Sequence, residues 1–229
     1  MDPRKIYSDK RLRGICVYCG LNPETSDHVP SKVFLDEPYP ENLPVVDACE
    51  SCNNGFSLDE EYLACFIECV LAGTTDPTKI RRLKVSRILT EKPALRSLIE
   101  STRNENNGQI LWNPDVKRMH LVLLKLARGH AAYECSEPRL DQPTAISVRS
   151  ILTMSKEERR SFEELSQNTV LPEIGSRAFM GTVVLGKELY FDEGWRVVQK
   201  DRYMYAVHYS GLMSVRFLLG GYLACEVDW

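Results

Sequence analysis

The amino-acid sequence predicts an α+β protein with a cysteine-rich N-terminal module, a helical middle and a β-rich C-terminal region. Three observations lead to this prediction. Two Cys-x-x-Cys pairs lie within the first 52 residues, and apolar residues recur at helical spacing between residues 57 and 130. Stretches of β-branched and aromatic residues, separated by glycines, fill the end of the chain. We expect two regions, residues 1–75 and residues 76–229.

The composition is that of a folded soluble chain. Of its 229 residues, 43% are hydrophobic and 27% are charged, which is close to the average of globular proteins. No run of 18 apolar residues occurs and the first residues are polar, so we expect no membrane association and a cytoplasmic location. In a reducing compartment, paired cysteines are better interpreted as metal ligands than as disulfides.

The cysteine pairs are the most informative feature of the N-terminal module. Cys16 and Cys19 form the first pair, and Cys49 and Cys52 form the second about thirty residues later. Four thiolates at this spacing are sufficient to close a tetrahedral zinc site. A closed site of this kind stabilises a fold and does no chemistry, so any reaction must use the residues between the two pairs. Order in this Pro- and Gly-rich segment should depend on the metal.

The helical middle begins directly after the second cysteine pair. Ser57 and Glu60 have the spacing of a capping box, the apolar run that follows continues to Leu71, and Gly73 ends it. Cys65 and Cys69 lie four residues apart on one face of this helix, which is typical of buried thiols. Further helices are expected at residues 93–102 and 116–130, and a short polar helix after residue 155.

The pattern of β-branched and aromatic residues in the C-terminal region indicates an antiparallel sheet. The expected strands are Phe179–Leu185, Trp195–Gln199, Tyr203–Tyr209, Ser214–Leu219 and Tyr222–Val227. Tyr203, Tyr205 and Tyr209 alternate along one strand. Either they pack on the sheet or they are exposed and stack on nucleic-acid bases.

Charge is unevenly distributed along the chain, although the net charge is only −3. The first third is acidic, whereas residues 76–130 have an excess of Lys and Arg. The candidate contacts to nucleic-acid phosphates are Lys79, Arg81, Arg82, Lys84 and Arg87. The alternative is an ordinary solvated helical face.

The order of motifs between residues 14 and 60 resembles the HNH nuclease family in its zinc-stapled form. That order is Cys-x-x-Cys, then Asp27-His28, then Asn42-Leu43, then Cys-x-x-Cys followed by Asn53. The resemblance implies a β-hairpin followed by a helix, the ββα-metal arrangement. It also implies an endonuclease that hydrolyses phosphodiester bonds, with DNA favoured over RNA, and it allows a homodimer.

The resemblance assigns a role to each matching position. His28 corresponds to the general base that activates water. Asp27 and Asn53 correspond to ligands of a catalytic divalent cation, with Asn54 a rival to Asn53, and Asn42 corresponds to the residue that steadies the hairpin loop. Asn53 could instead cap a local turn, and Asn42 could be an ordinary turn residue.

The residue types suit this chemistry independently of the family. A neutral imidazole, with an ordinary pKa of about 6.5, can accept the proton of an attacking water near neutral pH. Asp and Asn oxygens suit Mg²⁺ or a similar hard cation, whereas thiolates suit zinc. We therefore expect a structural zinc and a separate catalytic divalent cation.

A second interpretation is a non-catalytic, zinc-stabilised module that binds nucleic acid or protein. The acidic first third favours it. Acidic Asp59, Glu60 and Glu61 also stand where the nuclease family commonly has a basic residue after the last cysteine.

Overall fold

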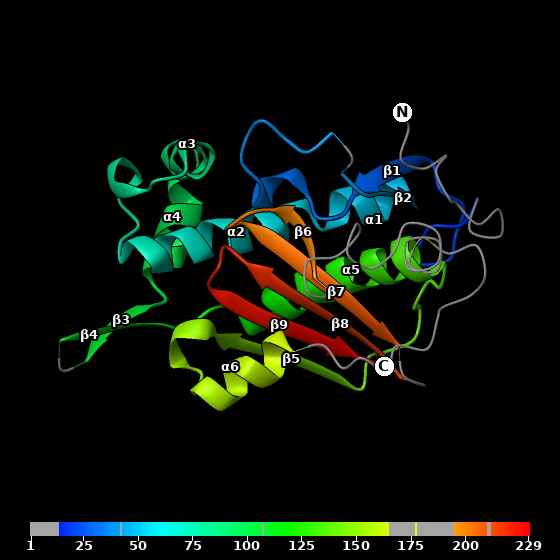
Figure 1. The fold of residues 1–229 in the computed structure, drawn as a ribbon. Coiled ribbons are helices and arrows are strands. Elements are labelled where there is room, and N and C mark those ends of the chain that lie inside the picture. Colours follow the sequence, from blue (N-terminus) through cyan, green and yellow to red (C-terminus); the bar gives the residue numbers. More distant parts are fainter. Residues whose placement is uncertain (1–13, 42, 107, 165–176, 178–194, 210–211) are drawn as a thin grey trace. The chain divides into compact units, whose positions relative to one another are not determined.

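The computed structural model describes residues 14–41, 43–106, 108–164, 177, 195–209 and 212–229 (Figure 1). The chain divides into two compact units. The larger unit comprises residues 1–55 and 123–229, and the smaller unit comprises residues 56–122. The boundary expected at residue 75 lies inside the smaller unit.

The N-terminal part of the larger unit is a hairpin followed by a short helix. Strand β1 (Thr25–His28) pairs antiparallel with β2 (Val45–Ala48), so that Asp27 lies opposite Val46 and His28 opposite Val45. The 3₁₀ helix η3 (Lys32–Phe34) lies in the connection between the strands, and helix α1 (Glu50–Gly55) follows β2. The order of elements is thus the predicted strand, strand and helix.

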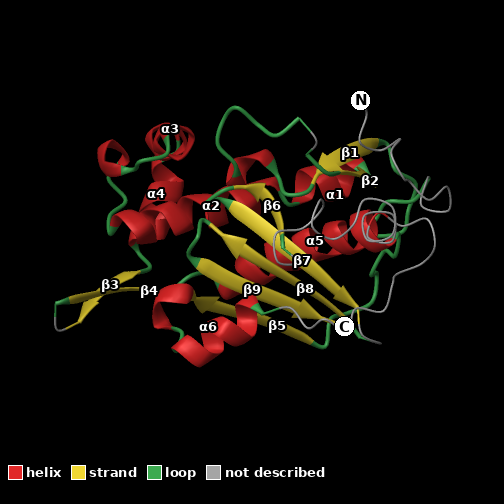
Figure 2. Ribbon diagram, viewed as in Figure 1, coloured by secondary structure: helices red, strands yellow, loops and turns green. Residues whose placement is uncertain are grey.

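The C-terminal part of the larger unit is an antiparallel five-stranded sheet with the order β5-β9-β8-β7-β6 (Figure 2). Its strands are β5 (Ala145–Ser150), β6 (Arg196–Gln199), β7 (Tyr203–Tyr209), β8 (Met213–Leu219) and β9 (Leu223–Asp228). Four of them coincide with predicted strands. The remaining predicted strand, Phe179–Leu185, lies outside the described residues, and β5 was not predicted.

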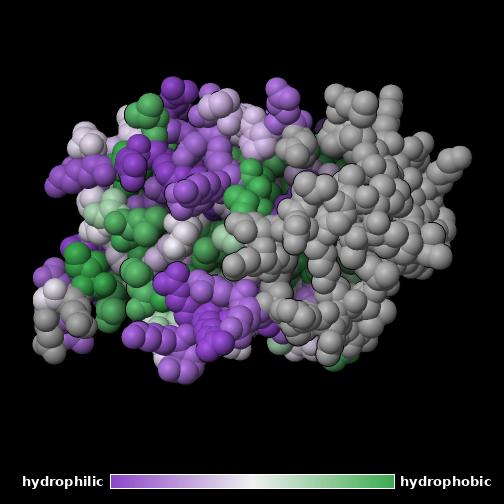
Figure 3. Space-filling model, viewed as in Figure 1, coloured by the Kyte–Doolittle hydropathy of each residue, from purple (hydrophilic) through white to green (hydrophobic). Residues whose placement is uncertain are grey.

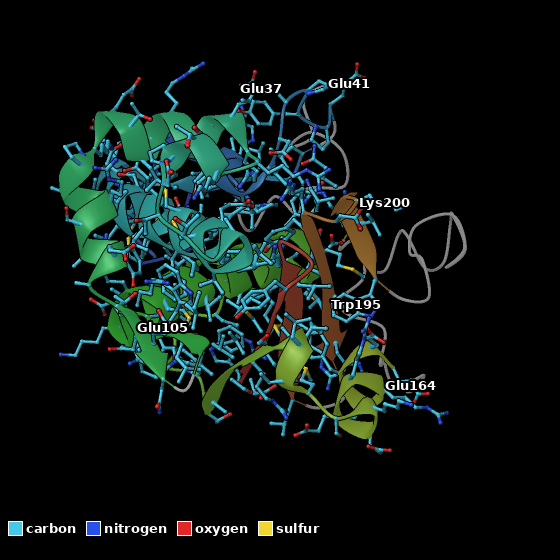
Figure 4. All side chains as sticks on the ribbon, turned by 90° about the vertical axis from the view of Figure 1, so that its left-hand side faces the viewer. Glu37, Glu41, Glu105, Glu164, Trp195 and Lys200 are labelled. Carbon is cyan, nitrogen blue, oxygen red and sulfur yellow. The ribbon has the colours of Figure 1, made fainter. Side chains whose placement is uncertain are left out.

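Helices cover both faces of this sheet. On one face, His130 from helix α5 (Val116–Cys135) stacks on Tyr205 with ring centroids 3.6 Å apart. On the other face, Phe162 from α6 (Lys156–Glu163) packs against Trp195, whose indole N–H donates to the Glu163 carbonyl at 2.9 Å. Trp195 and Glu164, the residue that follows α6, are labelled in Figure 4. Alternate residues of each strand therefore enter different cores.

Tyr203 and Tyr205 belong to the α5 side of the sheet and are fully buried. They cannot stack on nucleic-acid bases, so the packing interpretation is the correct one for these two residues.

The smaller unit is mainly helical. Its helices are α2 (Ser57–Ala72), η4 (Pro77–Lys79), α3 (Leu83–Glu91), α4 (Pro93–Glu100) and the first residues of α5. The hairpin of β3 (Arg103–Asn106) and β4 (Gln109–Trp112) follows α4. Cys65 and Cys69 are fully buried in a core with Tyr62, Phe66 and Leu89, as predicted.

Two helices begin near a Ser-x-x-Glu sequence, and their starts differ in the structure. At α6, Ser155 and Glu158 form a complete capping box, with backbone N–H groups donating to the Ser155 hydroxyl and the Glu158 carboxylate. At α2 the prediction was wrong, because Phe56 is the N-cap residue and has no side-chain cap. Phe56 itself has helical dihedral angles, and its carbonyl accepts from the Asp59 and Glu60 N–H groups.

The surface is mixed in character. Figure 3 shows hydrophilic side chains over α6 and hydrophobic ones on the β3–β4 hairpin, where Ile110 and Leu111 are exposed. None of the described helices has both the length and the apolar character needed to cross a bilayer.

Candidate functional site

The four predicted cysteines meet in one place. Cys16 and Cys19 lie in the loop before β1, Cys49 directly precedes α1, and Cys52 lies in the first turn of that helix. Their four sulfur atoms all lie within 4.8 Å of one another. The loop approaches β2 because the Val17 N–H donates to the Asp47 carbonyl at 3.1 Å, and Gly20 closes its turn with a positive φ of 78°.

The sulfur geometry suits a tetrahedral ion. The Cys19 and Cys49 sulfurs are 3.7 Å apart, and ligands at a zinc–sulfur distance of about 2.3 Å are separated by roughly 3.8 Å in a tetrahedron. The Cys52 N–H points to the Cys49 sulfur at 3.3 Å, a contact that favours a thiolate. Burial, together with the neighbouring sulfurs, raises the pKa of the Cys52 thiol. The cluster could thus hold a metal such as zinc, and binding it would release protons.

Asn53 ties α1 to the first strand of the hairpin. Its side-chain amide donates to the Thr25 hydroxyl at 3.0 Å and to the Ser26 carbonyl at 3.3 Å. This is a structural use of a residue predicted to bind a cation. Asn54, the rival candidate, is exposed. Asn42 lies outside the described residues.

His28 stands at the end of β1 and is half-buried. Burial lowers the pKa of its imidazole below the usual value, and the positive charge of Lys32 adds to this effect. The Asp27 carboxylate and the Pro44 carbonyl act in the opposite direction. The imidazole is therefore neutral at pH 7, and its buried Nδ1 atom has no hydrogen-bond partner among the described residues.

Asp27 is buried and already has a cation. The Lys125 ammonium of α5 lies 2.7 Å from Asp27 Oδ2, and the Tyr18 hydroxyl donates to the same oxygen at 2.8 Å. Lys125 also donates to the Ser31 hydroxyl at 3.0 Å. At the carboxylate where the sequence predicted a divalent cation, the structure places the ammonium group of a lysine.

Helix α5 is the scaffold for this site. Arg128 donates to the Tyr18 carbonyl at 3.4 Å, and Gly129 lies against Val29, the residue that follows His28. The same helix presents His130 and Glu134 to the sheet, where the Tyr205 hydroxyl donates to Glu134. One helix thus fixes both the hairpin and the sheet.

Tyr18 and Lys125 were missed as site residues. Lys125 lies three residues after Val122, within the apolar stripe of a predicted helix, and a lysine in such a place is a signal for a buried ion pair. The sequence did not indicate which acidic residue would pair with Lys125, because Asp27 lies 98 residues earlier in the chain.

The basic candidates of the smaller unit divide into two kinds. Arg82 is buried and pairs with Glu68 at 3.7 Å, so it is not available to a nucleic acid. Lys79, Arg81 and Arg87 are exposed, and Lys84 is half-buried.

Comparisons with protein-family models, curated proteins and solved structures found no match to this chain. The resemblance to HNH nucleases therefore depends on the order of the motifs and on the geometry described above.

Proposed function

We propose that the larger unit contains an HNH-type nuclease site, stapled by zinc, that hydrolyses phosphodiester bonds in nucleic acid. The observation that supports this most directly is the β1–β2–α1 arrangement, which closes the four sulfurs into one cluster and leaves His28 at the end of β1. The same order of elements is expected from the resemblance to the family. DNA is the favoured substrate.

In this proposal His28 is the general base. The neutral imidazole takes a proton from a water molecule as that water attacks the phosphorus, and the bond to the leaving oxygen breaks. Lys32, four residues later, is an exposed residue of η3, and its positive charge already acts on His28. We assign Lys32 the role of stabilising the phosphate, whose negative charge grows during the attack. Zinc holds the fold and takes no part in the reaction.

The exposed residues Lys79, Arg81 and Arg87 are the proposed contacts to the nucleic-acid backbone, with Lys84 beside them. Arg82 is left out of this set because of its buried pair with Glu68. A homodimer would allow the cutting of both strands of a duplex.

The test is a cleavage assay with matched proteins. Purified wild type and His28→Ala, each checked for zinc content, are incubated with plasmid DNA, single-stranded DNA and RNA, with and without added Mg²⁺. We expect cleavage by the wild type and a loss of about 10²–10⁴-fold in rate in the variant. No cleavage of any substrate, or equal cleavage by both proteins, would reject the proposal.

The Asp27–Lys125 pair favours a second candidate function, a zinc-stabilised module that binds nucleic acid or protein without catalysis. In that case the wild type would show no cleavage of any substrate. It would still bind nucleic acid, with an affinity that depends steeply on salt concentration. Replacing Lys79, Arg81 and Arg87 together by Gln should then reduce both the affinity and the salt slope.

A further inference from the structure

We infer that Lys125 is the resident cation of Asp27, and that this carboxylate is a positioning group which takes no divalent metal ion. The inference deepens the proposed function and rests on it only for the role of His28. It follows from the place of Lys125 in the fold rather than from any motif.

The Lys125–Asp27 pair is almost completely shielded from water. The two side chains are 1% and 8% exposed, and the ammonium and carboxylate are 2.7 Å apart. A buried charge is tolerated only when it is paired and its hydrogen-bonding groups have partners. Here Tyr18 donates to the carboxylate and Ser31 accepts from the ammonium. The charge of Asp27 is thus neutralised and its Oδ2 atom accepts from two donors.

A divalent ion at Asp27 would meet the ammonium at close range. Mg²⁺ binds carboxylate oxygens at about 2.1 Å, so an ion on either oxygen of Asp27 would lie close to Lys125 Nζ in a site with little water. Repulsion between two buried cations is strong, because the surroundings screen it weakly. Lys125 must leave before the ion can bind, yet Gly129 and Arg128, one turn away on α5, pack tightly on Val29 and Tyr18.

The pair also has a mechanical role. Asp27 directly precedes His28, and Lys125 connects it to α5 and to Ser31 on the far side of His28. The segment that carries the imidazole is thereby held on both sides. Lys125 contacts Asp27, Ser31 and the ring of Tyr18, and its side chain is buried, so we assign it as a positioning residue.

The experiment measures Mn²⁺ binding by the full chain, loaded with zinc, in the absence of nucleic acid. Electron paramagnetic resonance detects free Mn²⁺ directly, and Mn²⁺ competes poorly for thiolate sites. We expect no Mn²⁺ site at Asp27 in the wild type or in Lys125→Arg. Lys125→Met should gain one Mn²⁺ site, and Lys125→Met combined with Asp27→Asn should lose it again.

Mn²⁺ binding by the wild type that disappears in Asp27→Asn would overturn the inference. A folded, zinc-loaded Lys125→Met protein that gains no Mn²⁺ site would also overturn it. If Lys125→Met does not fold, the comparison of wild type with Asp27→Asn decides alone. The assay needs no catalysis, so failure of the nuclease proposal would appear only in the cleavage test with His28→Ala.

Discussion

Gly129 of α5 lies so close to Val29 that a methyl group at position 129 would approach Val29 Cγ2 to 2.6 Å. The contact joins the helix to the residue directly after His28. It requires a residue without a side chain in the middle of a helix, where glycine is otherwise unfavourable by about 1 kcal/mol relative to alanine. Close packing at this point outweighs helix propensity.

We therefore predict that Gly129→Ala destabilises the protein by about 1–3 kcal/mol, the usual cost of overpacking a core. Helix propensity alone predicts a change of the opposite sign. Urea unfolding measures the free energy of unfolding directly.

Two further variants serve as matched controls for Gly129→Ala. They are Val29→Ala alone and the double variant Gly129→Ala/Val29→Ala. In the double variant the space left by Val29 should accept the new methyl group, so the two changes should cost less together than the sum of their separate effects. Strictly additive effects would show that the two residues do not interact.

Zinc removal should act locally. Chelation, or Cys52→Ser, should abolish hydrogen-exchange protection in β1, β2 and α1, because residues 14–55 contain few elements of their own and close around the cysteines. The five-stranded sheet has its own cores on both faces and should keep its protection. Undiminished protection of β1 and β2 after complete zinc loss would show that the cysteines are not a structural metal site.

His130 should make stability depend on pH. It is fully buried, its Nε2 lies 2.7 Å from the Tyr203 hydroxyl, and burial together with Arg196 lowers its pKa well below 6.5, although Glu134 also lies nearby. As the pH falls below 6.5, the His130 imidazole becomes protonated in the unfolded chain but stays neutral in the folded protein. The free energy of unfolding should then fall by up to about 1.4 kcal/mol per pH unit.

In His130→Gln this loss of stability should be smaller, because position 130 no longer titrates. Urea unfolding at a series of pH values between 7 and 5 measures the slope in both proteins. Identical slopes would mean that other groups cause the dependence.

The charge of Lys32 should be detectable at His28. Because Lys32 lowers the pKa of this imidazole, Lys32→Met should raise it toward 6.5, whereas Lys32→Arg should leave it low. Titration of the His28 ring signals by nuclear magnetic resonance measures both. An unchanged pKa in Lys32→Met would place the lysine too far away to assist at a phosphate.

The parts of the fold that depend on local patterns could be predicted from the sequence. The helical spacing of apolar residues located α2, α4 and α5. Runs of β-branched and aromatic residues separated by glycines located β6 to β9. Strand β5 was missed because it is a polar, half-exposed edge strand that pairs with β9, almost eighty residues later. The N-cap of α2 was misplaced because Phe56 already has helical dihedral angles and accepts the first hydrogen bonds of the helix, so α2 begins one residue earlier than the Ser–Glu pattern indicates.

The candidate site was predictable where the chemistry resides in a short motif. The cysteine cluster follows from spacing, and its geometry supports the metal prediction. The environment of Asp27 is a tertiary property, since Lys125 reaches it from α5 across 98 residues. Similarly, the burial of Arg82 against Glu68 could not be inferred from a cluster of basic residues.

The most direct test of the proposed nuclease is the rate of cleavage as a function of pH in zinc-loaded wild type and His28→Ala. Since burial lowers the pKa of His28, the wild-type rate should be constant near pH 7 and fall on acidification at a pH below 6.5. The variant should be about 10²–10⁴-fold slower and lack this step. A variant with the wild-type rate and the wild-type pH profile would contradict the role of His28 as the general base.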